Sequence, residues 1–254
     1  MAKGRLKFTN RWMFNRVMCE EDVCREVLRA VTGIEAGEIV YLNAEQCYEP
    51  AAAEKGVRMD VVAKEDGRVY DIEMQVDREP SMGRRLRYYQ AAMDIASLEK
   101  GHAYSKLPES FIVFFCMYDP FGMGLPVYSI ERMCVEAKEM RVGDGSHWTA
   151  LNARAWVEAG GAVGEMLEYV GTGKATGPLT ERIDWLVAEF NKDKKWVGRV
   201  HTLEQEMEMQ VSEAEAAFGR LIVLLLDAGR VEDARRAATD AGYREELMRE
   251  LGRE

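Results

Sequence analysis

Apolar residues switch between helical spacing and strand-like runs along the chain, and this predicts a mixed α/β fold. An opening helix is expected over about 11–32, broken near Glu20 and ended by Gly33, because its apolar positions recur every three or four residues. The same spacing predicts a second helix over 82–100, before Gly101. The expected strands cover 38–48, 57–64, 68–76, 111–118, 125–130 and 149–153.

Two features fix most of the expected sheet. The dipeptide Asp66-Gly67 is a strong signal for a tight turn, so the strands on either side of it should form a hairpin. The run from Phe111 to Tyr118 is continuously apolar, as expected for a central strand that is buried on both faces. The expected order of the core is therefore helix, three strands, helix, strand.

The chain becomes helical beyond Gly160, and the pattern divides it into three parts. Residues 1–160 are expected to form the α/β domain, residues 161–200 a helical segment that packs on it, and residues 201–254 a helical tail. The tail should begin as a long acidic helix interrupted at Gly219 and Gly229 and end in short helices around Ala234 and Leu247. Its apolar positions favour packing or self-association, so a homo-oligomer is expected to form through these helices.

Composition restricts the function further. The chain has 254 residues, a net charge of −10 and five cysteines without a paired metal-binding motif, so a reduced, cytoplasmic protein is expected. It begins without the apolar stretch of a signal peptide, and no apolar run is long enough to cross a membrane. The negative charge argues against a general grip on nucleic acid, so any DNA contact must be local. The only dense basic cluster comprises Arg78, Arg84, Arg85 and Arg87.

The hairpin brings two acids together. If Asp66 and Gly67 are the two turn residues, Asp60 lies opposite Glu73. Directly opposed side chains have Cβ atoms roughly 4.5–5.5 Å apart, and like charges at that separation destabilise a sheet. A hard divalent cation offsets the repulsion, since Mg²⁺ binds through one or two carboxylates and takes further ligands from water and phosphate. The pattern predicts metal-dependent phosphodiester hydrolysis, in which the ion polarises the phosphate and activates a water.

Strand alternation adds other polar side chains to this site. Gln75 falls on the same side as the two acids and is a candidate to orient the attacking water. Arg58, on the same face, is a candidate to neutralise phosphate charge. A plainer alternative is that Asp60 and Glu73 lie on the solvent face of the hairpin, paired with Arg58 or Lys64.

The helix after the hairpin has two interpretations. In the first, it binds DNA, with an arginine and a tyrosine stacked one turn apart and the arginines holding phosphates. In the second, it is a solvated face whose arginines pair with Asp94 and Glu99. The candidate DNA-binding residues of this helix are Arg84, Arg85, Arg87 and Tyr89.

Three motifs carry a resemblance to a known family. The segments Gly56-Val-Arg-Met-Asp60-Val, Val69-Tyr-Asp-Ile-Glu73-Met-Gln75 and Arg84-Arg-Leu-Arg-Tyr-Tyr-Gln90 resemble motifs of the Rpn family of recombination-promoting nucleases and putative transposases. That family is a branch of the PD-(D/E)XK nucleases. Flanking segments are similar too, and the resemblance extends from about Phe8 to Trp196.

The resemblance implies a fold, a set of site residues and an activity. It implies a restriction-endonuclease-like core with a helical C-terminal extension, in which Asp60 and Glu73 bind Mg²⁺, with Mn²⁺ as an alternative. Gln75 stands where the wider superfamily usually has lysine, so water activation must depend more on the metal. The superfamily often adds an acid from the first helix, and here Glu21 or Glu26 is the candidate.

The implied activity is that of a DNA endonuclease in recombination or mobile-element biology. The main alternative is a catalytically weak DNA-binding or protein-interaction member that keeps the nuclease fold. A third reading is a nuclease for RNA or for DNA of special structure, and no further module in the sequence decides between them. The retention of Asp60, Glu73 and Gln75 together favours the enzyme.

Overall fold

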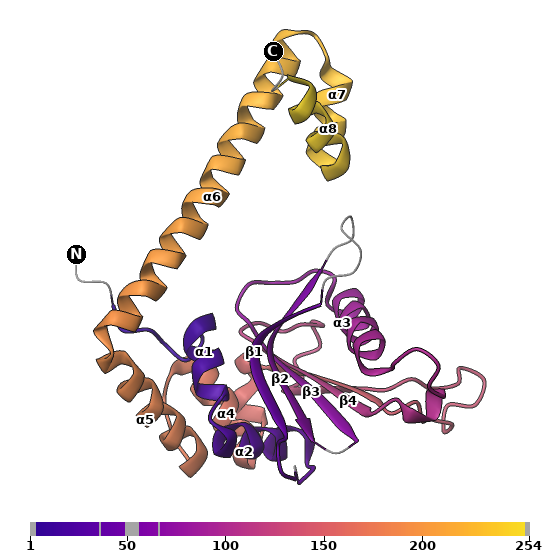
Figure 1. Cartoon of the computed structure of the whole chain (residues 1–254), viewed down its shortest axis with the longest axis vertical. Helices are drawn as coiled ribbons and strands as arrows, with labels where there is room; N and C mark the ends of the chain where they lie inside the picture. The colour runs from indigo at the N-terminus through magenta and orange to yellow at the C-terminus, as the bar shows by residue number, and fades with distance from the viewer. Residues whose placement is uncertain (1–3, 36, 49–55, 66, 252–254) are drawn as a thin grey trace. The chain divides into compact units, whose positions relative to one another are not determined.

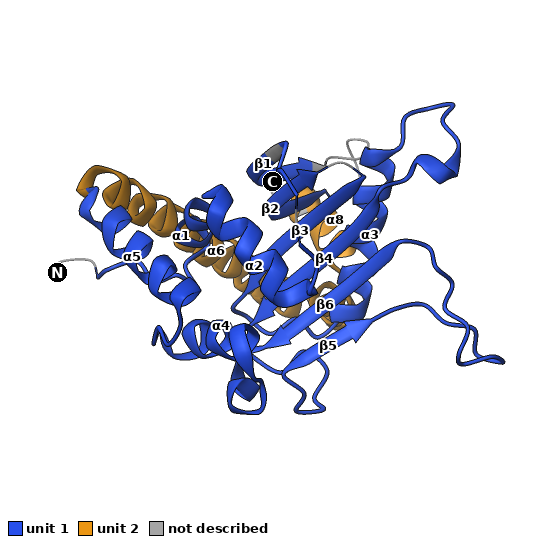
Figure 2. Cartoon of the chain, turned by 90° about the horizontal axis from the view of Figure 1, so that it is seen from below, with its two compact units in different colours: residues 1–193 blue, residues 194–254 orange. Residues whose placement is uncertain are grey.

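The chain divides into two compact units, residues 1–193 and residues 194–254 (Figures 1 and 2). The structure is a computed structural model, and it describes residues 4–35, 37–48, 56–65 and 67–251. Asp66 and most of the expected loop over 50–56 lie outside the described residues.

The first unit is a mixed sheet between two layers of helices. Its strands are β1 (Tyr41–Tyr48), β2 (Val57–Glu65), β3 (Arg68–Gln75), β4 (Glu109–Cys116), β5 (Val127–Ile130) and β6 (Ser146–Asn152). Its helices are α1 (Arg11–Met18), α2 (Glu21–Thr32), α3 (Met82–Ser97), α4 (Gly161–Thr172) and α5 (Pro178–Lys192), with short 3-10 turns η1 (Tyr104–Lys106) and η2 (Ala153–Glu158). Helix α3 covers one face of the sheet, and α1, α2 and α4 lie on the other (Figure 1).

The sheet confirms the expected core order of helix, three strands, helix, strand. Its six strands run in the order β1-β2-β3-β4-β6-β5, with β4 parallel to both of its neighbours and the other pairs antiparallel. The apolar strand β4 is central, as its composition predicts, and its residues from Ser110 to Cys116 are all buried. A parallel central strand must be reached by a crossover, and α3 supplies it between β3 and β4.

Several boundaries follow local signals in the chain. The opening helix is broken near Glu20 as expected, and Gly33 ends α2 in a left-handed conformation with φ 71°. Gly67 has φ 72°, as a tight turn requires, and β2 pairs with β3 so that Val61 lies opposite Ile72. Strand β1 begins at Tyr41 rather than near 38, and α3 ends at Ser97 rather than near 100.

A hydrophobic core lies between α3 and the sheet and packs against the strands that carry the candidate site. Phe114 of β4 is fully buried there and meets the Tyr89 ring of α3 edge-on, with ring centroids 5.6 Å apart. Gln90 of α3 donates to Ser110 of β4 and accepts from Trp148 of β6. These contacts fix α3 along its length against the central strands.

The second unit is a helical tail with a core of its own. It contains α6 (Lys194–Asp227), α7 (Val231–Thr239) and α8 (Ala241–Leu251). The expected interruption at Gly219 is wrong, because α6 continues through that residue. A single glycine costs a helix only about 1 kcal/mol, and the buried side chains of Leu221 and Leu225 hold the next turns in place. Gly229 does lie between helices, with φ 73°.

None of the helices in the described part of the chain combines the length and the apolar composition that crossing a bilayer requires.

We expect Phe114→Ala to lower the free energy of unfolding of the first unit by about 3–5 kcal/mol, because it empties a fully buried site. Urea denaturation followed by tryptophan fluorescence measures this, since four of the five tryptophans lie in the first unit: Trp12, Trp148, Trp156 and Trp185. Ile95→Ala is the control, because Ile95 is 80% exposed on α3 and should change stability by about 0.5 kcal/mol or less. Equal losses in the two variants would contradict the assigned core.

Candidate active site

Hydrogen bonds run in both directions between Asp60 and β3. The Asp60 backbone N–H donates to Glu73 Oε1 at 2.7 Å, and the Met74 backbone N–H donates to Asp60 Oδ2 at 3.1 Å. The register of β2 and β3 extends to the pair Val61 and Ile72, one step before the acids. Side-chain acceptors therefore take over from backbone carbonyls at this point, and each carboxylate is tied to the strand that carries the other.

Burial excludes the alternative in which the acids decorate a solvent face. Asp60 is 9% exposed and Glu73 is 2% exposed. Burial is the main reason that the pKa of Asp60 is raised, although the Met74 N–H and nearby arginines oppose the change. Burial, and then the charge of Asp60, raise the pKa of Glu73 to about 8. Both acids are therefore in surroundings that penalise two negative charges.

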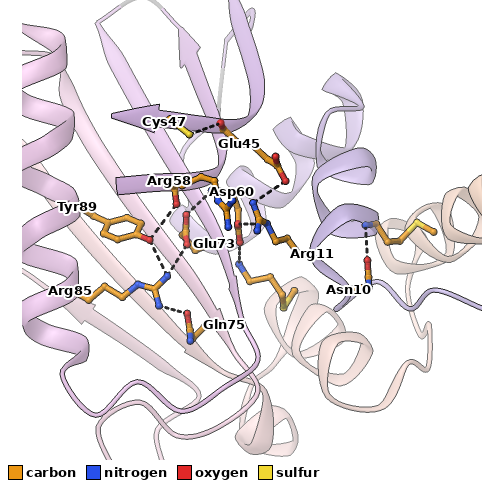
Figure 3. Close-up of polar contacts among 12 residues, drawn as sticks. Asn10, Arg11, Glu45, Cys47, Arg58, Asp60, Glu73, Gln75, Arg85 and Tyr89 are labelled. Carbon is orange, nitrogen blue, oxygen red and sulfur yellow. Dashed lines mark hydrogen bonds and ion pairs between the residues drawn. The ribbon is translucent and has the colours of Figure 1, made fainter. Parts of the chain in front are cut away.

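Guanidinium groups flank the acids from both sides of the sheet (Figure 3). Arg85 of α3 lies with a terminal nitrogen 3.3 Å from Glu73 Oε2, and Arg11 of α1 has Nε 3.9 Å from Asp60 Oδ1. The acids and arginines enclose a cavity of about 330 Å³. Its lining residues are Arg11, Arg58, Asp60, Glu73, Met74, Arg85 and Tyr89.

The expected residues Gln75 and Tyr89 are both joined to Arg85. One terminal nitrogen of Arg85 donates to Gln75 Oε1, and the other donates to the Tyr89 hydroxyl at 2.9 Å. The Gln75 amide nitrogen donates to the Asp77 carbonyl at 2.7 Å, which leaves the amide oriented from both ends. Tyr89 is buried against Phe114, and the Arg85 guanidinium carbon lies 5.1 Å from the centroid of its ring, so the expected stacking of the arginine and the tyrosine is present within the protein.

The other basic candidates lie around this cavity at different depths. Arg58 lines it from β2. Arg84 and Arg87 are exposed and line two neighbouring hollows beside the start of α3, one of which also includes Arg85 and Tyr89. Arg78 is exposed and is not among the residues that line any of these three hollows.

Neither candidate acid from the opening helices lines the cavity. Glu21 and Glu26 lie on α2 with exposed side chains, and Glu21 pairs with Arg25 one turn away. The side chain that the opening helices contribute is Arg11, a cation rather than an acid. Sequence spacing offered no signal for it, because its position depends on how α1 packs against the sheet.

A third carboxyl group lies beneath the two acids. Asp71 is fully buried on β3, two residues before Glu73, and neither of its oxygens receives a hydrogen bond among the described residues. Burial, followed by the charges of Glu73 and Asp60, raises its pKa well above the ordinary value. A hydrogen bond between the Asp71 and Glu73 carboxyl groups requires one of them to be protonated. Asp71 therefore adds a third acidic group to the buried pair. Strand alternation places it on the face of Glu73, which was the available signal.

The donor set fits a hard divalent cation with few protein ligands. Among the described residues, no three histidine, cysteine or acidic side chains converge as a preformed metal cage. Asp60 and Glu73 can offer two carboxylates, and Mg²⁺ commonly completes its shell with water and substrate phosphate. Asp71 has no hydrogen-bond partner among the described residues, and the pKa values of Asp60 and Glu73 are raised. Both observations indicate a site that an additional positive charge would stabilise.

Residues 8–121 match the profile of the PD-(D/E)XK nuclease family transposase. Over this range the chain is similar to that family. The match covers α1 to β4 and the start of the loop that follows, and it includes every residue of the cavity. It confirms the resemblance found in the motifs and the PD-(D/E)XK fold of the core. Searches of the curated proteins and of the solved structures gave no match.

The raised pKa of Glu73 makes the stability of the metal-free protein depend on pH. Between about 4.5 and about 8 the folded chain keeps a proton on Glu73 that the unfolded chain loses, so stability should fall as pH rises through this window. The slope contributed by this group is at most about 1.4 kcal/mol per pH unit. Urea denaturation in EDTA at several pH values measures it.

Glu73→Gln is the matched variant, because it keeps the shape and one acceptor but cannot ionise. Its unfolding free energy should depend less steeply on pH than that of the wild type in the same window. Mg²⁺ should stabilise the wild type most at the upper end of the window, where the carboxylate is charged. A wild-type profile that is flat or that rises with pH in this window, or one with the same slope as the variant, would contradict the assigned burial.

Proposed function

We propose that this protein is a divalent-metal-dependent DNA endonuclease that hydrolyses phosphodiester bonds, in recombination or mobile-element biology. The observation that carries the proposal is the pair Asp60 and Glu73, two buried carboxylates tied to each other's strands inside a cavity lined by arginines. Burying two carboxylates close together costs free energy unless a bound cation neutralises their charge. The family of residues 8–121 supports nuclease chemistry at this pair.

Asp60 and Glu73 are the residues that would hold the metal, with Mg²⁺ as the expected ion and Mn²⁺ as an alternative. When bound, the ion supplies Lewis-acid polarisation of the phosphate and lowers the pKa of an attacking water. The chain's own residues hold the two carboxylates in position. Glu73 is held by the Asp60 N–H, and Asp60 by the Met74 N–H, so neither carboxylate needs to reorganise during the reaction.

Arg85 accounts for the presence of glutamine at the position where the superfamily usually has lysine. Its guanidinium reaches Gln75 and Glu73 at once, so a fixed positive charge already lies beside the metal-binding acid. A lysine at 75 would put a second cation against Arg85. We therefore assign the electrostatic role to Arg85 and the orientation of the attacking water to Gln75, whose amide is held at both ends.

DNA contact is proposed to be local and to follow the arginines around the cavity. Arg58 lines the cavity from an exposed position on β2, and Arg84 and Arg87 line the hollows beside it from exposed positions on α3. Guanidinium groups bind phosphate oxygens in a bidentate manner. This arrangement allows a chain with a net charge of −10 to hold a polyanion at one place.

One observation favours a second candidate, a DNA-binding protein with little catalysis. The ion pair between Arg85 and Glu73 partly neutralises the buried acid, so the fold can persist without a metal. In that case the cavity would bind phosphate but not cleave it. The experiment below separates the two candidates.

We expect the wild-type protein to nick supercoiled plasmid in Mg²⁺ or Mn²⁺, and Asp60→Asn and Glu73→Gln to lose that activity down to the background. Both substitutions keep the size of the side chain and remove the charge that holds the metal. Agarose gel electrophoresis of the plasmid over time gives the rates, and EDTA should abolish wild-type nicking.

Glu26→Gln is the matched control for this experiment. It removes an exposed acid of α2 that does not line the cavity, so it should nick at the wild-type rate. Nicking that survives in both site variants would exclude the proposed metal site. Plasmid binding by a wild-type protein that nicks in neither metal would favour the second candidate.

The roles of Arg85 and Gln75 give a double-mutant prediction. Arg85→Gln should slow nicking by about 10²-fold or more, since it removes one fixed electrostatic stabiliser. Gln75→Lys alone should not accelerate the reaction, because its ammonium lies against Arg85. In the Arg85→Gln background, however, Gln75→Lys should recover part of the lost rate. Additive effects in the nicking assay would contradict a charge shared between the two positions.

A further inference from the structure

Arg11 is held over the cavity by a contact that leaves part of its guanidinium unused. One terminal nitrogen donates to Glu45 Oε1 at 2.9 Å. Its Nε is buried, lies 3.9 Å from Asp60 Oδ1, and has no hydrogen-bond partner among the described residues. A buried charged donor without an acceptor is costly, so this atom is placed for a partner that the protein itself does not supply.

The atom of Arg11 that lacks a hydrogen-bond partner lies on the side of Asp60, so an acceptor for it would share the cavity with that acid. A cation held by the acids would weaken the attraction of Asp60 for this nitrogen, and an oxygen of the phosphodiester would then be a suitable acceptor. Arg11 comes from α1 and Arg85 from α3, on opposite sides of the two acids (Figure 3). Two guanidiniums in this arrangement can hold one phosphodiester from both sides.

Glu45 lies on β1 at a position from which its carboxylate can hold the Arg11 guanidinium beside Asp60. The register of β1 and β2 pairs Ala44 with Val61 and Gln46 with Met59, so Glu45 lies beside Asp60. Its φ of 61° is the only left-handed backbone angle of a non-glycine residue among the described residues. Strain of this kind persists where the surroundings fix it, and it is common at functional sites.

We infer that Arg11 is a further phosphate-binding residue of the site, with Glu45 as the residue that positions its guanidinium. The inference rests on the proposed function, because the bound anion is the phosphodiester of the DNA substrate. It assigns to α1 a substrate contact that the motifs of the hairpin and of α3 do not include.

The test is fluorescence anisotropy of a labelled DNA duplex with the full chain, in Ca²⁺ instead of Mg²⁺ to limit turnover, at several KCl concentrations. Arg11→Gln should weaken binding on the order of tenfold and reduce the slope of log K against log salt concentration by about 1. Arg11→Lys should keep most of that slope, because it keeps the charge, but lose affinity through its poorer geometry.

Glu45→Gln gives the decisive comparison. Gln keeps an oxygen that can accept from Arg11, so the guanidinium stays positioned, but the negative charge that competes with phosphate is removed, and binding should tighten by up to about fivefold. If the Arg11–Glu45 pair were only structural, both variants would weaken that pair and binding would weaken in both. Opposite signs therefore support a phosphate contact, and a shared sign overturns it.

A control and a parallel assay separate this inference from the proposed function. Arg29→Gln removes an arginine that is exposed on α2 and paired with Glu35 at 3.7 Å, and it should leave affinity and slope unchanged. Thermal denaturation of each variant checks folding, and plasmid nicking by Asp60→Asn runs alongside. Loss of nicking in Asp60→Asn with an unchanged salt slope in Arg11→Gln overturns the inference alone. A wild type that neither binds nor nicks overturns both.

Discussion

Asp60 and Glu73 are two buried acids on adjacent strands, and the rest of the site is arranged around the cost of keeping them close together. Burial and mutual repulsion both favour the protonated acids. Two backbone N–H groups and the flanking arginines oppose this, and they do so without filling the cavity. The strands therefore give up part of their backbone ladder to keep two charges close and accessible from one side.

This compromise explains why the fold around the site is so heavily supported. The central strand β4 and helix α3 pack Phe114 and Tyr89 under Arg85, which fixes the guanidinium that faces Glu73. Gln90 ties α3 to β4 and β6. A charged side chain can be buried only where its position is well determined, because a small displacement would leave it unpaired. The core beneath α3 is therefore part of the electrostatics of the site.

Local patterns in the sequence were sufficient to predict the hairpin and its two acids. Turn chemistry at Asp66-Gly67 and strand alternation bring Asp60, Glu73 and Gln75 together without reference to the rest of the chain. Arg11 and Glu45 could not be found in this way, because their contact joins a helix to an edge strand far away in sequence. The continuity of α6 through Gly219 was missed for a related reason: tertiary packing of Leu221 and Leu225 outweighs a modest local propensity.

On the proposed function, metal binding and DNA binding share one set of charges. Arg85 and Arg11 lie near the acids, where they partly neutralise them, and the same guanidiniums are proposed to bind the phosphate of the substrate. A cation at the carboxylates would release the arginines toward the backbone of the substrate, and bound phosphate would in turn favour the cation. Such mutual reinforcement requires each ligand to bind more tightly when the other is present. For a chain that is strongly acidic overall, the proposed coupling would confine affinity for DNA to the place where cleavage is proposed to occur.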